Sequence, residues 1–149
     1  MRKTARSSGL AAAVILAFGM PLEAFASHLG TKSATCRLKE CTYAITVESC
    51  DAEGIHPDYE YIFVDKGAHV LKWVIITPGY KFPPQGTSGI KFTKPAGPAE
   101  ISGATRISDT EFSVKDSNPQ GKKKVLKYDI DIVNGAGTHC VYDPSVVNE

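Results

Sequence analysis

Short runs in which apolar and polar residues alternate, broken by turn-forming residues, restrict the fold of this chain more than any other feature. Residues 43–47 and 125–133 carry apolar side chains at nearly every second position, as expected for strands that bury one face. Residues 70–77 are almost continuously apolar and β-branched, which is typical of a central strand. Shorter strand candidates lie at 59–63, 80–82, 88–93, 101–107, 112–114 and 141–142. No segment beyond the N-terminal region has helical periodicity, so we predict an all-β protein.

Turn formers separate these candidates, with Pro78-Gly79 after one strand and Asn134-Gly135-Ala136-Gly137 marking a hairpin. Seven or eight short strands with such spacing favour a single-domain antiparallel β-sandwich. On strand pattern alone, residues 36–149 loosely resemble immunoglobulin-like or cupredoxin-like sandwiches, and a partly open barrel is the alternative. A fold resemblance of this kind implies no function by itself.

The first 26 residues have the layout of a secretory signal peptide. Arg2, Lys3 and Arg6 form a positive region, residues 10–20 are apolar, and Ala24-Phe25-Ala26 is a cleavage motif. A membrane-spanning helix needs about 20 apolar residues, more than this run provides. We therefore predict cleavage before Ser27, a folded domain over residues 27–149, no transmembrane segment after cleavage, and a periplasmic or secreted location.

Four cysteines follow the predicted cleavage site: Cys36, Cys41, Cys50 and Cys140. In an exported protein they indicate two disulfides that stabilise the domain, and three pairings are possible. We predict Cys36–Cys41 as a local loop and Cys50–Cys140 as a link between an early strand and the last hairpin. A metal–thiolate cluster is the less favoured alternative, since the chain has no C-x-x-C pair.

Charge and composition exclude some function classes. The chain has 17 basic and 16 acidic residues and a formal net charge of +1, which argues against nucleic acid as a partner. With 42% hydrophobic and 22% charged residues, the composition is that of a folded globular domain.

Four histidines, His28, His56, His69 and His139, raise the possibility of a copper or zinc site. A blue-copper centre uses two histidines, a cysteine thiolate and usually a methionine. Both methionines precede Ser27, and the cysteines are expected to pair. The neighbouring His139 and Cys140 also point to opposite faces of a strand. We therefore expect no cofactor, and keep a copper- or zinc-binding or redox protein without a blue-copper site as the alternative.

Aromatic and charged side chains give weaker indications of a binding surface. Tyr80 and Phe82 border a proline-rich stretch, where they form either a recognition patch or, as we favour, a cover over one end of the sandwich. Trp73 is expected in the core. The basic run 122–124 is expected at a hairpin tip, either solvated or touching an anionic surface. Asp129 and Asp131 are expected on a solvated strand face.

The chain lacks the short motifs of common enzymes, including a phosphate-binding loop, a G-x-S-x-G elbow and H-E-x-x-H. We therefore favour a non-catalytic binding module, exported to the envelope or beyond, whose partner is a protein, a glycan or another envelope component. The alternatives are the metal or redox protein above and a small secreted enzyme or enzyme inhibitor.

Overall fold

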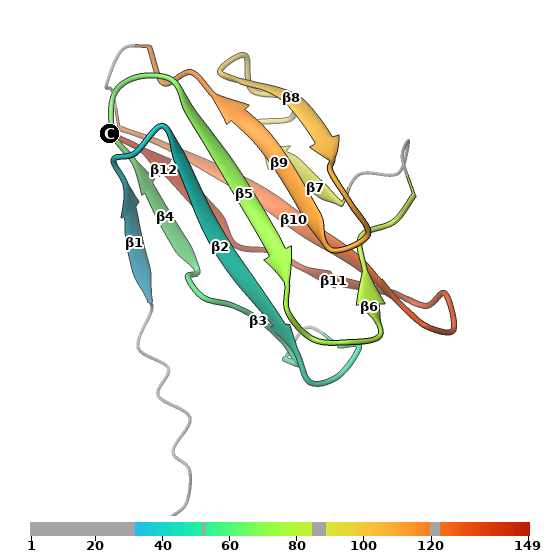
Figure 1. Cartoon of the computed structure of the whole chain (residues 1–149). Helices are drawn as coiled ribbons and strands as arrows, with labels where there is room; N and C mark the ends of the chain where they lie inside the picture. The colour runs from blue at the N-terminus through green and yellow to red at the C-terminus, as the bar shows by residue number, and fades with distance from the viewer. Residues whose placement is uncertain (1–31, 52, 85–88, 120–122) are drawn as a thin grey trace, which may run out of the picture.

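A computed structural model describes residues 32–51, 53–84, 89–119 and 123–149. The predicted signal segment 1–26 therefore lies outside the described residues. Twelve strands form two sheets, and no helix occurs in the described part of the chain (Figure 1). The strands are β1 (Ser33–Cys36), β2 (Glu40–Val47), β3 (Ile55–Pro57), β4 (Tyr61–Val64), β5 (His69–Ile75), β6 (Tyr80–Lys81), β7 (Ile90–Lys94), β8 (Ile101–Arg106), β9 (Glu111–Asp116), β10 (Lys124–Asn134), β11 (His139–Tyr142) and β12 (Ser145–Asn148). The all-β prediction is confirmed.

One sheet has five strands in the order β3-β2-β5-β9-β8. The other has seven, with the path β1-β4-β12-β10-β11 and with β6 and β7 also paired to β10. Lys127 of β10 pairs with Ser145 of β12 and also with Lys94 of β7. Since a residue has one neighbour on each side in a sheet, β7 lies along the edge of β10 opposite β12.

Strand direction differs from the prediction of purely antiparallel sheets. Three pairs are parallel: β1 with β4, β4 with β12, and β2 with β5. The sheets are therefore mixed, which also departs from the antiparallel sheets of an immunoglobulin domain. A period-two pattern specifies that a strand buries one face, but it carries no information about the direction of the neighbouring strand.

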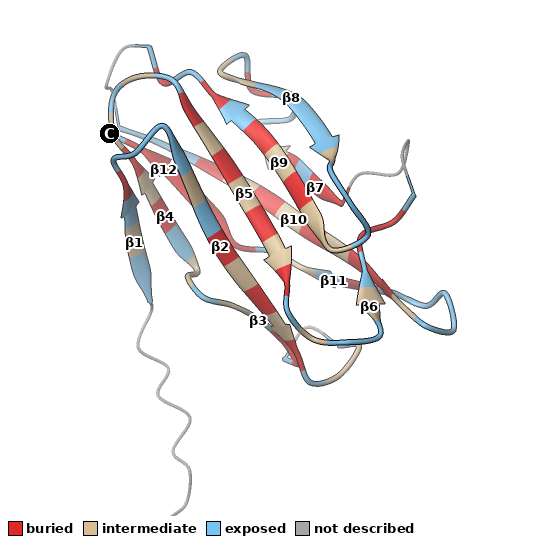
Figure 2. Ribbon diagram, in the orientation of Figure 1, coloured by how far each residue is buried: buried red, intermediate tan, exposed pale blue. Residues whose placement is uncertain are grey.

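The core consists of buried residues from the strands of both sheets, which are red along the ribbons in Figure 2. In β5 the exposure alternates residue by residue, and Leu71, Trp73 and Ile75 are buried. Trp73 packs against Tyr128 of the other sheet with 5.3 Å between ring centroids, and its Nε1 donates to the Tyr128 hydroxyl at 3.2 Å. The predicted place of Trp73 in the core is confirmed.

The hairpin between β10 and β11 is closed by the side chain of Asn134. Its Oδ1 accepts hydrogen bonds from the N–H groups of Ala136 and Thr138, both at 3.0 Å. Gly137 has φ 80°, a conformation that favours glycine. The Asn-Gly-Ala-Gly run thus forms the turn that the sequence predicted.

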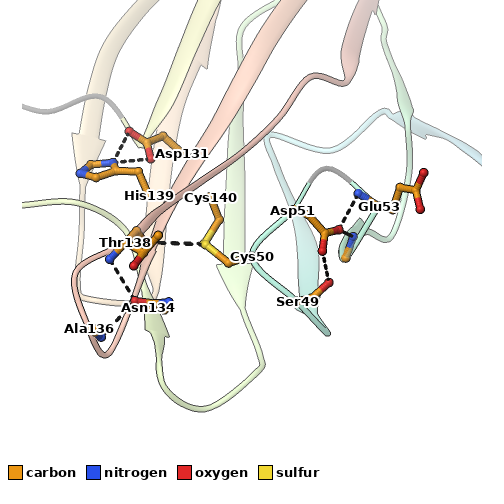
Figure 3. The surroundings of a disulfide bond; sticks show 11 residues. Ser49, Cys50, Asp51, Glu53, Asp131, Asn134, Ala136, Thr138, His139 and Cys140 are labelled. Atoms are coloured by element: carbon orange, nitrogen blue, oxygen red, sulfur yellow. Dashed lines mark hydrogen bonds and ion pairs between the residues drawn. A yellow bond between two sulfur atoms is a disulfide. The ribbon is translucent and has the colours of Figure 1, made fainter.

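Both predicted disulfides are present, Cys36–Cys41 and Cys50–Cys140. The first closes the loop between β1 and β2. The second joins the segment after β2 to β11 and so connects the two sheets (Figure 3). No cysteine is free, so the thiolate-cluster alternative is wrong. Two disulfides in an all-β domain are typical of proteins that fold in an oxidising compartment.

Candidate functional site

A pocket of about 470 Å³ lies beside Asn148, close to the C-terminal end of the described chain. Its walls come from segments far apart in the sequence: the turn before β8, the segment after β9, the start of β10 and the end of β12. The lining residues are Ala99, Glu100, Ser117, Asn118, Pro119, Lys123, Lys124 and Asn148. The volume is in the range of small-molecule sites, and six of the eight lining residues have polar or charged side chains.

Asn118 lies in the pocket lining and bonds to segments from other parts of the chain. Its Nδ2 lies 3.0–3.1 Å from three backbone oxygens, those of Val64, Asp65 and Glu149. Its own carbonyl accepts from the N–H of Gly67 at 3.1 Å. Asn118 has a positive φ of 21°, a region where asparagine is several-fold enriched among residues with a side chain. This one side chain ties the end of β4 and the end of the chain to the segment after β9.

A buried polar cluster lies beside Asn118. Oδ1 of Asp116 accepts from the backbone N–H of Asn118 at 3.0 Å and from Nδ2 of Asn148 at 3.2 Å. Oδ2 of Asp116 and Oδ1 of Asn148 are buried and have no partner. Burial raises the pKa of Asp116 above its ordinary value, and the nearby charge of Glu100 acts in the same direction. His69, which pairs with Asp116 across β5 and β9, donates from Nδ1 to the Leu38 carbonyl at 2.7 Å, and its Nε2 is buried without a partner.

Charge at the mouth of the pocket comes from two lysines and one glutamate. Lys124 donates to Glu100 at 2.5 Å. Burial acts to raise the pKa of Glu100, but the hydrogen bond and charge of Lys124 outweigh it and lower that pKa. Lys123 forms no ion pair with any described residue. Of the two lysine ammonium groups at the mouth, that of Lys124 is paired with Glu100, and that of Lys123 has no ion-pair partner among the described residues.

Ser117, the hydroxyl residue of the lining, donates to the Glu100 backbone carbonyl at 3.2 Å. Of the basic run 122–124, Lys123 and Lys124 line the pocket, and Lys122 lies outside the described residues. The sequence pattern did not indicate the pocket itself. Residues 116–121 are rich in turn formers, and only the fold brings Asp116 and Ser117 beside Asn148 and Glu100.

The structure places the two predicted patch residues differently. Phe82 is fully buried and packs against Phe112 with 5.5 Å between ring centroids. Because Phe82 is fully buried, it does not contribute to an exposed recognition patch, which was the less favoured of the two interpretations. Tyr80 begins β6, is partly buried and packs against the core.

The three histidines in the described part of the chain do not form a common site. His28 lies outside the described residues. His56 on β3 contacts Glu48 at 3.8 Å, and His69 is buried beside the Cys36–Cys41 disulfide. His139 is exposed, and its Nδ1 lies 2.8 and 3.1 Å from the two carboxylate oxygens of Asp131 (Figure 3). Within the described ranges, no group of three or more histidine, cysteine, aspartate or glutamate side chains is arranged to hold a metal ion.

No family model matches the chain, and no curated protein matches it significantly. Among the described residues, no helix is both long and apolar enough to span a membrane. The functional assignment therefore depends on the pocket and its surroundings.

Proposed function

We propose that the protein is an exported binding module that takes an anionic group of its partner, a carboxylate or a phosphate, into the end pocket. Lys123, which has no ion-pair partner among the described residues, carries this proposal. An ammonium group at the mouth of a polar pocket attracts an anion and forms charge-assisted hydrogen bonds to it. Envelope glycans and polymers that bear carboxylates or phosphates have this chemistry.

The hydrogen bonds of the lining residues support the same proposal. Asn118 ties the end of β4 and residue 149 to the segment after β9, and Lys124 pairs with Glu100 at the mouth. A site that is already ordered before binding loses little conformational entropy when the ligand arrives.

The binding experiment uses the mature chain, residues 27–149, labelled for NMR and titrated with inorganic phosphate and with acetate. We expect saturable shifts at Asn118 and Lys123, and several-fold weaker affinity in Lys123→Gln. Lys81→Gln is the matched control, because Lys81 is exposed on β6, away from the pocket. The proposal would be contradicted if the anions shifted the NMR signals of Lys81 and Lys123 equally and Lys123→Gln left the affinity unchanged.

Export is part of the proposed function and has its own test. The two disulfides and the predicted signal peptide support it. Expression of the full chain in a bacterium with an intact export machinery, followed by fractionation and mass spectrometry, is expected to give a mature N-terminus at Ser27. A protein that stays in the cytoplasm and keeps residues 1–26 would contradict it.

One contact supports the copper or zinc alternative. Asp131 receives the Nδ1 proton of His139, which leaves Nε2 as the free ligand atom. Such a carboxylate commonly orients a metal-binding histidine. Calorimetric titration with Zn²⁺ and Cu²⁺ tests this alternative. It requires that the protein binds one of these ions, that His139→Gln abolishes the binding, and that His56→Gln leaves it intact.

A further inference from the structure

The disulfide that closes the loop between β1 and β2 joins one partly exposed cysteine to a buried one (Figure 1). Cys41 is partly exposed, whereas Cys36 is fully buried. A thiolate that attacks this bond from solvent therefore reaches the sulfur of Cys41, and the sulfur of Cys36 is the one that leaves. The surroundings of Cys36 then determine how readily the bond is exchanged.

A buried histidine lies beside the sulfur that would leave. Nδ1 of His69 is 3.8 Å from Sγ of Cys36, and it donates to the Leu38 carbonyl at 2.7 Å. When the S–S bond breaks, the Cys36 sulfur takes up negative charge, and a charged acceptor binds an N–H about twice as strongly as a neutral one. His69 is therefore positioned to stabilise the leaving thiolate, which favours exchange at this disulfide.

The Cys50–Cys140 disulfide has different surroundings. Among the described residues, the hydrogen-bond contacts of its two sulfurs are with the Thr138 carbonyl oxygen, at 3.9 and 3.6 Å. His139 precedes Cys140 in β11, but its Nδ1 bonds to the carboxylate of Asp131. A carbonyl oxygen accepts hydrogen bonds and donates none, so it does not stabilise a thiolate. The imidazole beside Cys36 is thus what distinguishes the two disulfides.

The fold holds Cys36 and Cys41 in place even without the bond between them. Cys36 ends β1, which pairs with β4, and Cys41 lies near the start of β2, which pairs with β5. Between them, the Lys39 carbonyl accepts from the N–H of Val70 at 2.8 Å. The bond spans 5 residues, against 90 for the other disulfide, so its loss frees less chain entropy. The reduced protein therefore stays folded with its two thiols close together, and the exchange is reversible.

We infer that Cys36–Cys41 is a thiol–disulfide exchange site for the dithiol of a partner protein, while Cys50–Cys140 stays oxidised. A partner thiolate attacks Sγ of Cys41, the bond to Cys36 breaks, and its electron pair goes to the Cys36 sulfur. The second partner thiol then attacks the mixed disulfide and releases Cys41. The partner loses two electrons and two protons, which Cys36 and Cys41 gain. These residues lie outside the pocket lining, and the inference goes beyond the proposed pocket function.

The first test uses the oxidised mature chain, residues 27–149, and glutathione, a monothiol that lacks the second thiol of the partner. Samples are quenched with acid after short times and mapped by mass spectrometry without reduction. We expect glutathione joined to Cys41 and an intact Cys50–Cys140 bond. Glutathione joined to Cys36, no adduct at all, or reaction of Cys50–Cys140 at the same rate would overturn the inference.

The second test measures how fast dithiothreitol, which carries two thiols, reduces Cys36–Cys41 in variants of His69. His69→Leu removes the N–H donor and is expected to slow the reduction about tenfold, the effect of losing one hydrogen bond to a charged group. His69→Asn places an amide N–H near the position of Nδ1 and should restore most of the rate. Equal rates in these two variants would overturn the inference. His56→Leu is the matched control, because His56 is an exposed histidine on β3.

Two measurements keep this inference separate from the pocket proposal. Circular dichroism before and after reduction of Cys36–Cys41 is expected to show the same β-rich spectrum, and unfolding on reduction would contradict reversible exchange. Lys123→Gln is expected to leave the rate of reduction unchanged. If Lys123→Gln weakens phosphate binding but glutathione does not react at Cys41, the pocket proposal stands and this inference fails; the opposite pair of results has the opposite meaning.

Discussion

Asn148 at the end of β12 donates a hydrogen bond to Asp116 at the end of β9 and so joins the two sheets at 3.2 Å. Both side chains are almost completely buried, and each keeps one oxygen without a partner. Buried acceptors without a donor cost free energy, and a charged acceptor costs more than a neutral one. The pocket end of the sandwich is therefore less stable than its hydrogen bonds alone would indicate.

Replacing Asp116 with asparagine is expected to stabilise the protein at neutral pH by about 1–2 kcal/mol. Oδ1 is retained as the acceptor for Asn118 and Asn148, and the buried charge is removed. The pKa of Asp116 is raised in the fold, so the native state holds its proton more tightly than the unfolded chain. The wild type therefore loses stability as the pH rises from the ordinary value of 3.8 through the raised pKa, and the variant does not. Urea unfolding across this range measures both curves.

Asp51→Asn is the control, because the fold shifts the pKa of Asp51 in the opposite direction to that of Asp116. The Ser49 hydroxyl bond, followed by N–H bonds from Gly54 and Glu53, lowers the pKa of Asp51. Its carboxylate therefore favours the folded state above pH 3.8, and that contribution disappears on acidification through the lowered pKa. If the two variants changed the pH dependence of the unfolding free energy in the same direction, burial of Asp116 would not be the cause of its effect.

Removing the hydroxyl of Tyr128 is expected to destabilise the core. Trp73 Nε1 donates to this hydroxyl between the sheets, and Tyr128→Phe leaves that N–H buried without an acceptor, at a cost of about 1–3 kcal/mol. Tyr43→Phe is the comparison, since the Tyr43 hydroxyl is buried without a partner and burial raises its pKa to about 12. Thermal unfolding should show a lower melting temperature for Tyr128→Phe and an unchanged or higher one for Tyr43→Phe. An equal drop in both would contradict the role of the Trp73 bond.

Gly89 allows two aromatic rings to close over it, and Gly89→Ala is expected to cost about 1–3 kcal/mol through overpacking. A Cβ at this position would lie 2.7 Å from Cδ1 of Phe82 and 2.9 Å from Cδ2 of Phe112. Gly135 has open space around it, so Gly135→Ala should be nearly neutral. Chemical denaturation compares the two, and similar midpoints would show that the rings move aside freely.

Loss of the Cys50–Cys140 disulfide should lower the melting temperature more than loss of Cys36–Cys41. The two bonds span sequence separations of 90 and 5 residues. The loop-entropy estimate assigns them about 4.6 and about 2 kcal/mol respectively. Calorimetry of the paired serine variants, Cys50→Ser with Cys140→Ser and Cys36→Ser with Cys41→Ser, measures the difference. The reverse order would mean that native contacts of the short loop outweigh chain entropy.

Local pattern identified most of the strands, because alternation reports which face of a strand is buried. Residues 43–47 and 125–133 lie within β2 and β10. Three strands were missed: β1, β3 and β12. β1 and β3 are too short to alternate visibly, and β12 is buried at all four positions, so it has no polar face to mark it.

The sequence by itself determined the all-β class, the number of disulfides and the burial of Trp73, because each depends on residue type and short spacing. Tertiary structure alone decided that three strand pairs run parallel, that Phe82 is in the core, and that Asn118 and Asn148 line one pocket. These features arise where segments distant in the chain meet. Which segments meet is set by the packing of the whole core, a property that no short stretch of sequence contains.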